Sequence, residues 1–349
     1  MNLRSKWARL LASVAVIGLA SCGGDGSPDT YTVSGTLAGS VGPVVVSLNG
    51  GNNVTLSSPG SFTFPTRLST GSSYLVTADG AQNCNVTNAF GTVVLSNISN
   101  VTITCTTVVR SATLSGASEN PPVTTTATGR GAIVVNPTTK EITGGATITG
   151  LTPSAGGHHI HQAPAGNPTG NGPVIIGLLL ASDGRTLTVP ANTVLTDAQY
   201  AALVAGELYM NIHTAAHPGG EIRGQLNQRA NLSAGLATLT GAQEVPPVTT
   251  AASGRGTIVF DSNTRQVIIA YATHTVASPT VAHIHTGASG VSGPADVMTL
   301  NANTGRFTSP AAASLTAQNV TDFLAGRTYF NVHSTTFPAG EIRGQIAVQ

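Results

Sequence analysis

Six histidines of this 349-residue chain recur in one arrangement at two places. A His-x-His triplet stands at residues 159–161 and again at 283–285, and an Asn-x-His sequence follows each triplet about fifty residues later. In a β-strand, both histidines of a triplet project from the same face, so a third imidazole from a neighbouring strand would complete a set suited to zinc or copper. The predicted metal ligands are His159, His161, His213, His283, His285 and His333.

An alternative interpretation is that these histidines are interior hydrogen-bonding groups, each holding a loop through one ring nitrogen. The comparison of the two copies bears on this choice, because the chain's remaining histidines do not recur. Ala282 stands where the first copy has His158, Phe337 stands where it has His217, and His274 has no counterpart. The sequence leaves both interpretations open, and it identifies neither the metal nor a protein ligand.

Other polar residues also recur, in strands that end each copy. Glu221 and Arg223 share one face of such a strand because Ile222 alternates with them, and Glu341 and Arg343 repeat the pattern. They are predicted to form a structural ladder of ion pairs and hydrogen bonds. The alternative is that a glutamate, which does not itself bind the metal, hydrogen bonds to a metal-bound histidine and orients its ring.

Two further glutamates precede proline-rich segments. Glu119 and Glu244 are candidate partners of Arg130 and Arg255, or supports for a metal ligand. The chain has no nucleophile elbow, no phosphate-binding glycine loop and no Cys-x-x-Cys pair. The sequence therefore indicates no catalytic residue, and a binding or structural role is favoured over an enzymatic one.

The composition indicates an all-β protein with more than one domain. Charged residues make up 8% of the chain and aromatic residues 4%, and the formal net charge is +1. Sequences rich in Gly, Thr, Ser, Ala and Val form short strands and turns. The near-neutral balance, without a basic patch, argues against nucleic-acid binding.

The second part of the chain is a tandem repeat with a period of about 120 residues, which is the size of a whole domain. We expect one domain at 108–229 and a second at 230–349. Each copy consists mostly of predicted strands and holds one short helix, at residues 196–205 and 316–325. Each helix starts at a capping threonine and stops at a glycine.

Both copies resemble the CHRD domain, the module named after chordin and also found in exported bacterial proteins. In the first copy the resemblance rests on residues 119–123, 129–131, 159–161, 172–174, 209–213 and 218–225. In the second it rests on residues 244–248, 283–285, 293–294, 329–333 and 338–345. The resemblance covers about two thirds of the chain and implies a β-sandwich or barrel in each copy.

A second, local resemblance concerns the His-x-His strand alone, which is similar to the copper-binding strand of copper/zinc superoxide dismutases. The chain has no counterpart of that family's bridging histidine or of its zinc-binding loop. Superoxide dismutation is therefore not implied.

The N-terminal sequence is typical of a lipoprotein signal peptide. Basic residues precede a short apolar run in residues 1–22, which ends in Leu19-Ala20-Ser21-Cys22, a sequence that resembles the lipobox of bacterial lipoproteins. The resemblance implies that Cys22 is lipidated and that the chain is exported and anchored to a membrane. The residue after Cys22 is Gly23 and not Asp, which implies sorting to the outer membrane. The sequence does not indicate which side of that membrane the protein faces. Residues 23–30 are predicted to be a flexible tether.

Residues 31–107 are predicted to form a separate β-sandwich of about seven short strands, loosely similar to Ig-like or transthyretin-like modules. Its two cysteines, Cys84 and Cys105, are an even pair in an exported chain, and we expect them to form a disulfide. The predicted fold is therefore all-β, with three sandwich or barrel domains in series. We expect a cell-envelope lipoprotein with two binding or structural modules, or alternatively a copper- or zinc-binding protein with one three-histidine site per repeat and a redox role left open.

Overall fold

The computed structural model describes residues 29–38, 44–57, 60–80, 83–137, 139–229 and 231–349. Within these ranges the chain is mostly strand, with two α-helices. The predicted signal peptide, the lipidated Cys22 and most of the predicted tether lie outside the described residues.

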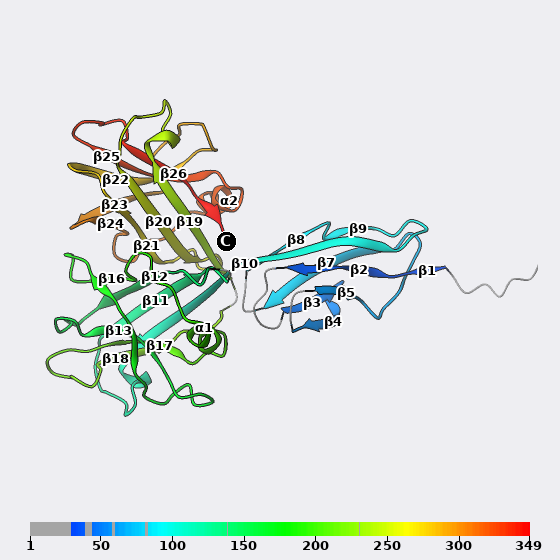
Figure 1. The fold of residues 1–349 in the computed structure, drawn as a ribbon, viewed down its shortest axis with the longest axis horizontal. Helices are drawn as coiled ribbons and strands as arrows, with labels where there is room; N and C mark the ends of the chain where they lie inside the picture. The colour runs from blue at the N-terminus through cyan, green and yellow to red at the C-terminus, as the bar shows by residue number, and fades with distance from the viewer. Residues whose placement is uncertain (1–28, 39–43, 58–59, 81–82, 138, 230) are drawn as a thin grey trace, which may run out of the picture.

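The N-terminal strands form an elongated unit that extends to the right in Figure 1. Its strands are β1 (Thr30–Tyr31), β2 (Val33–Ala38), β3 (Val44–Leu48), β4 (Gly51–Leu56), β5 (Gly60–Thr63), β6 (Leu68–Ser69), β7 (Ser73–Gly80), β8 (Asn83–Thr87) and β9 (Phe90–Thr92). Valine, leucine and phenylalanine side chains from alternate positions of these strands form its core. The disulfide expected between Cys84 and Cys105 is present, at directly opposite positions of β8 and β10.

One long strand, β10 (Ile98–Ser115), joins this unit to the first repeat. Its first half pairs with β2 and β8, and its second half, from Val108 onward, pairs with β11. The predicted boundary at residue 107 thus lies inside a continuous strand.

The two repeats lie one above the other at the left of Figure 1, and each is built on a barrel-like sheet. The first repeat continues with β11 (Thr128–Val135), β12 (Ile142–Thr149), β13 (His158–Gln162), β14 (Val174–Gly177), β15 (Leu179–Leu180), β16 (Thr186–Thr188), β17 (Leu208–Ile212) and β18 (Ile222–Gln225). The second has β19 (Leu232–Thr240), β20 (Ser253–Asp261), β21 (Val267–His274), β22 (Pro279–Thr286), β23 (Met298–Asn303), β24 (Arg306–Thr308), β25 (Thr328–Ser334), β26 (Ile342–Gln345) and β27 (Ala347–Val348). Pairing of β19 with β20 closes the second sheet.

Alternation along the strands places apolar side chains inside each repeat. Ile160 of β13, Met210 of β17 and Ile222 of β18 are fully buried in the core of the first repeat. Their neighbours in sequence therefore project from the opposite face of the sheet. That opposite face carries the histidines.

Each repeat contains one short helix, α1 (Asp197–Val204) and α2 (Ala317–Leu324). Thr196 and Thr316 cap their N-termini, and the third residue of each helix completes a capping box. Positive φ angles at Gly206 and Gly326 end the helices, as glycine permits. No helix of the described residues is long and apolar enough to cross a membrane.

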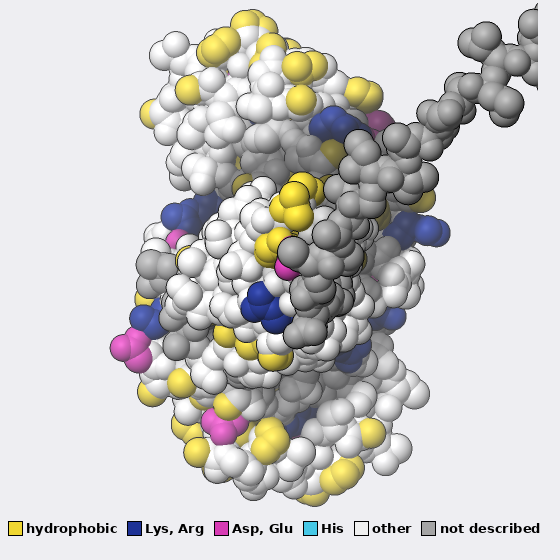
Figure 2. Space-filling model, turned by 90° about the vertical axis from the view of Figure 1, so that its right-hand side faces the viewer, with side chains coloured by type: hydrophobic (Ala, Val, Ile, Leu, Met, Phe, Trp, Pro, Cys, Tyr) yellow, Lys and Arg dark blue, Asp and Glu magenta, His cyan; other side chains and the backbone are white. Residues whose placement is uncertain are grey.

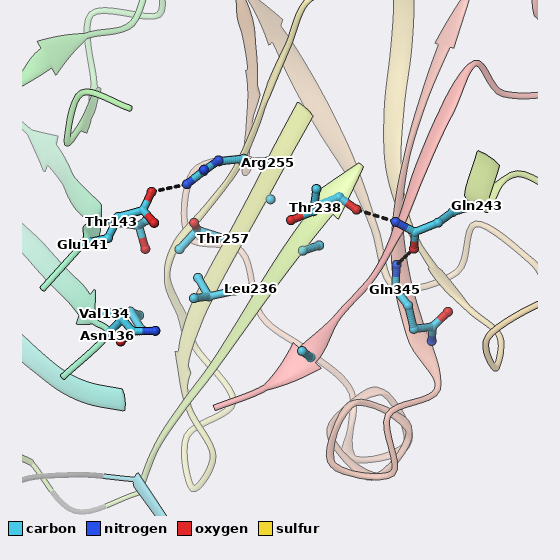
Figure 3. Close-up of a pocket in the computed structure, with 13 residues that line it drawn as sticks. Val134, Asn136, Glu141, Thr143, Leu236, Thr238, Gln243, Arg255, Thr257 and Gln345 are labelled. Atoms are coloured by element: carbon cyan, nitrogen blue, oxygen red, sulfur yellow. Dashed lines mark hydrogen bonds and ion pairs between the residues drawn. The ribbon is translucent and has the colours of Figure 1, made fainter. Parts of the chain in front are cut away.

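The two repeats pack against each other through a small apolar core and reciprocal polar contacts. Val109, Ala132 and Val134 of the first repeat meet Val259, Ile269, Tyr271 and neighbouring side chains of the second. Arg255 pairs with Glu141 across this contact, at one side of a groove of about 480 Å³ (Figure 3). Arg130 hydrogen bonds to Gln266 at the corresponding position.

These contacts correct one expectation from the sequence. Glu119 and Glu244 were candidate partners of Arg130 and Arg255, but both arginines reach across to the other repeat instead. The reason is tertiary, since the strands that carry them form the contact between the repeats. On the face drawn in Figure 2, charged side chains are scattered, as the composition implies.

Candidate metal centre

The predicted histidines of the first repeat come from two adjacent antiparallel strands. His159 lies opposite Asn211, and His161 lies opposite Tyr209, in the pairing of β13 with β17. His213 follows the end of β17 and continues its alternation. The three imidazoles therefore share the face of the sheet that points away from the core.

The second repeat reproduces this arrangement on β22 and β25. His283 lies opposite Asn331 and His285 lies opposite Tyr329, while His333 is part of β25 itself. In each repeat, one nitrogen from every histidine of the set lies within 4.8 Å of the corresponding nitrogens of the other two. The structure therefore brings all six predicted histidines into two sets of three.

Backbone carbonyl oxygens hold two histidines of each set in one tautomer. In the first repeat, Nδ1 of His161 lies 2.9 Å from the Gly172 oxygen, and Nδ1 of His213 lies 3.0 Å from the Pro218 oxygen. A carbonyl oxygen only accepts hydrogen bonds, so each Nδ1 carries the proton when the ring is neutral. The Nε2 atom of each ring is then left with a lone pair.

The second repeat has the same carbonyl contacts. Nδ1 of His285 lies 3.0 Å from the Gly293 oxygen, and Nδ1 of His333 lies 3.0 Å from the Pro338 oxygen. The tautomer is therefore set in the same way in both repeats.

In the first repeat, one nitrogen of each ring is buried and unpaired. Nδ1 of His159 and Nε2 of His161 and His213 are buried without a hydrogen-bond partner among the described residues. In the second repeat, Nδ1 of His283 lies 3.2 Å from Nε2 of His333. Two nitrogens that bind one ion tetrahedrally at about 2.0–2.1 Å are about 3.3–3.4 Å apart, so this pair already has a suitable spacing.

The other nitrogen separations within each set are at most 4.8 Å. Nitrogens that bind one ion at the same bond length are about 3.4–4.2 Å apart, depending on the angle between the bonds. The three nitrogens of each set therefore lie within about 1.4 Å of the spacing that a common ion needs. The donor set, three imidazoles and no carboxylate, is chemically suited to zinc or copper.

Burial favours the neutral form of four of the six rings. It is the main cause that lowers the pKa of His159, His161, His283 and His285, and neighbouring histidines lower it further. Since a ring must be unprotonated to bind a metal, the environment favours the form that acts as a ligand.

An aromatic and cationic stack supports each set from one side. The ring of His161 stacks on Tyr209 at 4.9 Å, and the guanidinium of Arg223 lies 3.5 Å from the centroid of that tyrosine. Arg223 also donates to the carbonyl oxygens of Pro168 and Gly170, in the loop that leads to Gly172. The arginine thus fixes the loop whose carbonyl orients His161.

The family comparison agrees with this duplication. The family model of the CHRD domain matches residues 110–226 and again residues 236–346. The chain belongs to the CHRD domain family. Searches of the curated proteins and of the solved structures found no match.

Each CHRD domain therefore contains one complete histidine set and its stack. In the second domain the stack consists of His285, Tyr329 and Arg343, with ring centroids 4.8 Å apart and the guanidinium 3.6 Å from the tyrosine ring. The sequence showed that the tyrosines recur but not what they do. Their role depends on the register that places each one opposite the second histidine of the triplet.

The glutamates of the terminal strands hydrogen bond to threonine hydroxyls. Glu221 accepts hydrogen bonds from the hydroxyls of Thr125 and Thr214, each at 2.7 Å, and Glu341 accepts one from Thr250 at 2.8 Å. The Thr214 hydroxyl is the main cause that lowers the pKa of Glu221. The Nδ1 atoms of His161, His213, His285 and His333 contact carbonyl oxygens, so these glutamates do not hydrogen bond to them there.

The predicted ladder of side chains is a hydrogen-bond network rather than a row of ion pairs. Arg223 and Arg343 are 2% exposed, and both donate to loop carbonyl oxygens. The other histidines stay outside the sets: His274, for example, packs against Phe307 at 5.2 Å. Among the described residues, only the histidines that recur belong to the two sets.

Proposed function

We propose that each CHRD domain binds one copper or zinc ion through its three histidines. One observation carries this proposal: in both domains, one nitrogen from each of three imidazoles lies within 4.8 Å of the other two, and carbonyl oxygens engage the Nδ1 atoms of two of the three rings. Buried polar atoms are normally paired, so the three unpaired ring nitrogens of the first domain call for a partner, as does Nε2 of His285 in the second. A metal ion would satisfy all three at once.

Two features of the set support zinc or copper. Imidazole nitrogen is a favoured ligand of both ions, and hard cations such as calcium and magnesium prefer oxygen. Three protein ligands also leave one coordination position open for water or another small ligand. A hydrogen bond from each ligand's second nitrogen, as His161 makes to Gly172, is typical of metal-binding histidines.

We further propose that the protein lies at the bacterial cell envelope. The lipobox-like sequence that ends at Cys22 supports export and a lipid anchor, and Gly23 supports sorting to the outer membrane. The N-terminal β unit would act as a spacer between the anchor and the two CHRD domains. In this view the chain has three β domains in series, with one helix in each CHRD domain.

The second candidate is a binding or structural module in which the histidines serve the fold alone. The hydrogen bonds from histidine Nδ1 atoms to loop carbonyl oxygens favour it, because they tie loops to the sheet without a metal. Under this alternative, removing a histidine lowers stability equally with and without metal.

Elemental analysis of the full chain, purified without an affinity tag, separates the two. We expect about two equivalents of zinc or copper per chain, and loss of both in the His161→Ala, His285→Ala double variant. His217→Ala, a histidine outside the sets, should keep the wild-type metal content. Folded wild-type protein that takes up neither metal on titration would refute metal binding.

A further inference from the structure

Each CHRD domain also buries a glutamate that lies outside the histidine set. Glu119 and Glu244 follow the short 3-10 helices η1 (Gly116–Ser118) and η2 (Gly241–Gln243), and each is 7% exposed. A buried carboxylate needs a cation or several hydrogen-bond donors. The ion pairs found among the described residues involve other carboxylates.

Among the described residues, the one hydrogen-bond partner of each glutamate carboxyl is a buried asparagine. Asn211 Nδ2 donates to Glu119 Oε2 at 3.4 Å, and Asn331 Nδ2 donates to Glu244 Oε2 at 3.3 Å. The remaining oxygens, Oε1 of each glutamate and Oδ1 of each asparagine, are buried and have no partner in the described part of the chain. Two acceptors are thus left without a donor in each domain.

The unpaired oxygens of each domain approach one glycine. A Cβ placed on Gly220 would lie 2.5 Å from Asn211 Oδ1 and 2.7 Å from Glu119 Oε1. In the second domain, a Cβ on Gly340 would lie 2.7 Å and 2.8 Å from the corresponding atoms of Asn331 and Glu244. Both oxygens of each pair therefore face the same glycine, which has a positive φ.

Among the described residues, the stacked arginines are the charged groups that interact with these glutamates. Arg223 lowers the pKa of Glu119 and Arg343 lowers that of Glu244, but both guanidinium groups donate to loop carbonyl oxygens instead of to the carboxyls. Burial outweighs them and raises the pKa of each glutamate to about 7.

We propose that Glu119 and Glu244 are proton-binding sites, in which each carboxylic acid forms a cyclic pair with its asparagine amide. The acid's Oε1–H donates to Asn Oδ1 while Asn Nδ2 donates to Oε2, so one proton satisfies both unpaired oxygens. The pair ties the loop after the 3-10 helix to the strand that carries the asparagine. We call this acid–amide pair the latch, and it opens when the carboxyl loses its proton.

A bound cation fits these atoms less well. Calcium takes six to eight oxygen ligands, and each site offers three side-chain oxygens beside an arginine. The latch uses none of the histidine nitrogens, so it does not rest on the proposed metal binding.

The direction of the pH effect follows from the two states of the chain. In the unfolded chain these carboxyls release their protons near the ordinary pKa of 4.5, and in the folded chain near 7. Stability from the latch is fully present below about pH 4.5, falls as the pH rises to about 7, and stays low above it. The 2.5-unit difference between these pKa values corresponds to at most about a 300-fold change in the folded-to-unfolded ratio per glutamate.

The test uses the full chain with a chelator present and compares wild type with a Glu119→Gln, Glu244→Gln double variant. The glutamine amide can donate to Asn Oδ1 without a titratable proton, so the variant keeps the latch closed at every pH. Glu221→Gln is the matched control, because it removes one negative charge from a carboxylate whose pKa is lowered. Denaturant midpoints are measured from pH 5 to pH 9.

We expect the wild-type midpoint, taken relative to that of the double variant at the same pH, to fall between pH 5 and about pH 7.5, and Glu221→Gln to show the same relative fall. The buried histidines, whose lowered pKa values act in the opposite direction, titrate in all three proteins and cancel in this comparison. Infrared spectra of the folded wild type at pH 6 should show the carbonyl stretch of a protonated carboxyl, which the double variant lacks. Equal pH profiles, or equal infrared spectra, in wild type and double variant would overturn the proposal. So would calcium or magnesium raising the midpoint at pH 8 in wild type alone.

Discussion

Replacing His161 by asparagine separates the two roles that its ring could play. Asparagine Nδ2 can occupy the position of histidine Nδ1 and still donate to the Gly172 carbonyl oxygen, but it has nothing at the position of Nε2. Alanine removes both groups. The pair of variants, His161→Asn and His161→Ala, therefore distinguishes a ligand from a loop-holding residue.

The structure supplies the magnitudes. A buried acceptor that loses its donor costs about 1–3 kcal/mol, and the lower end applies here because the Tyr209 hydroxyl lies 3.4 Å from the same Gly172 oxygen. Without metal, we expect His161→Ala to be about 1 kcal/mol less stable than His161→Asn. With free zinc at 100 times its Kd, one bound ion adds about 2.7 kcal/mol to wild type. Both variants should lose this increment in the first CHRD domain.

The assay is denaturant unfolding of the full chain with and without zinc, together with the metal content of each variant. His285→Asn provides the matching measurement in the second domain, where the Gly293 oxygen accepts the hydrogen bond. Wild-type metal content in both asparagine variants would refute the assignment of Nε2 as a ligand. Equal stability of His161→Asn and His161→Ala without metal would refute the role of Nδ1.

Three further predictions concern the scaffold. Gly256→Ala places a Cβ 2.4 Å from the ring of Phe330, so overpacking should cost about 1–3 kcal/mol, seen as a lower denaturant midpoint. Arg223→Lys keeps the charge but loses the planar group that stacks and donates to two carbonyl oxygens; we expect a loss of about 1–3 kcal/mol by the same measurement, and no loss would contradict that role. Replacing Cys84 and Cys105 by alanine should cost about 3 kcal/mol, as expected for closing a loop of 21 residues, and unchanged thermal unfolding would argue against it.

Much of the histidine site was predictable from local pattern and from the repeat. The alternation around Ile160 and Ile284 placed two histidines of each triplet on one face, because side chains alternate in any β-strand. The recurrence of His213 as His333 added the third member. His158 was set aside for the same reason, since Ala282 stands in its place.

The partners of the glutamates and arginines were not predictable in this way. Glu119 lies beside Asn211, and Arg130 crosses to Gln266 of the other domain. These residues are far apart in sequence, and no local pattern specifies which strands become neighbours. Local pattern likewise did not show that β10 runs through the predicted boundary at residue 107, because the length of a strand depends on the strands that pair with it.

The sequence by itself determined the all-β class, the duplication of the CHRD domain, the disulfide pair and the identity of the recurring histidines. Each of these follows from residue type, spacing or repetition along the chain. Only the tertiary structure decided which ring nitrogens are free to bind a metal. The Gly172 and Pro218 carbonyl oxygens that select the tautomer belong to loops positioned by the whole sheet. A ligand's residue type is a property of the sequence, whereas its free lone pair is a property of the fold.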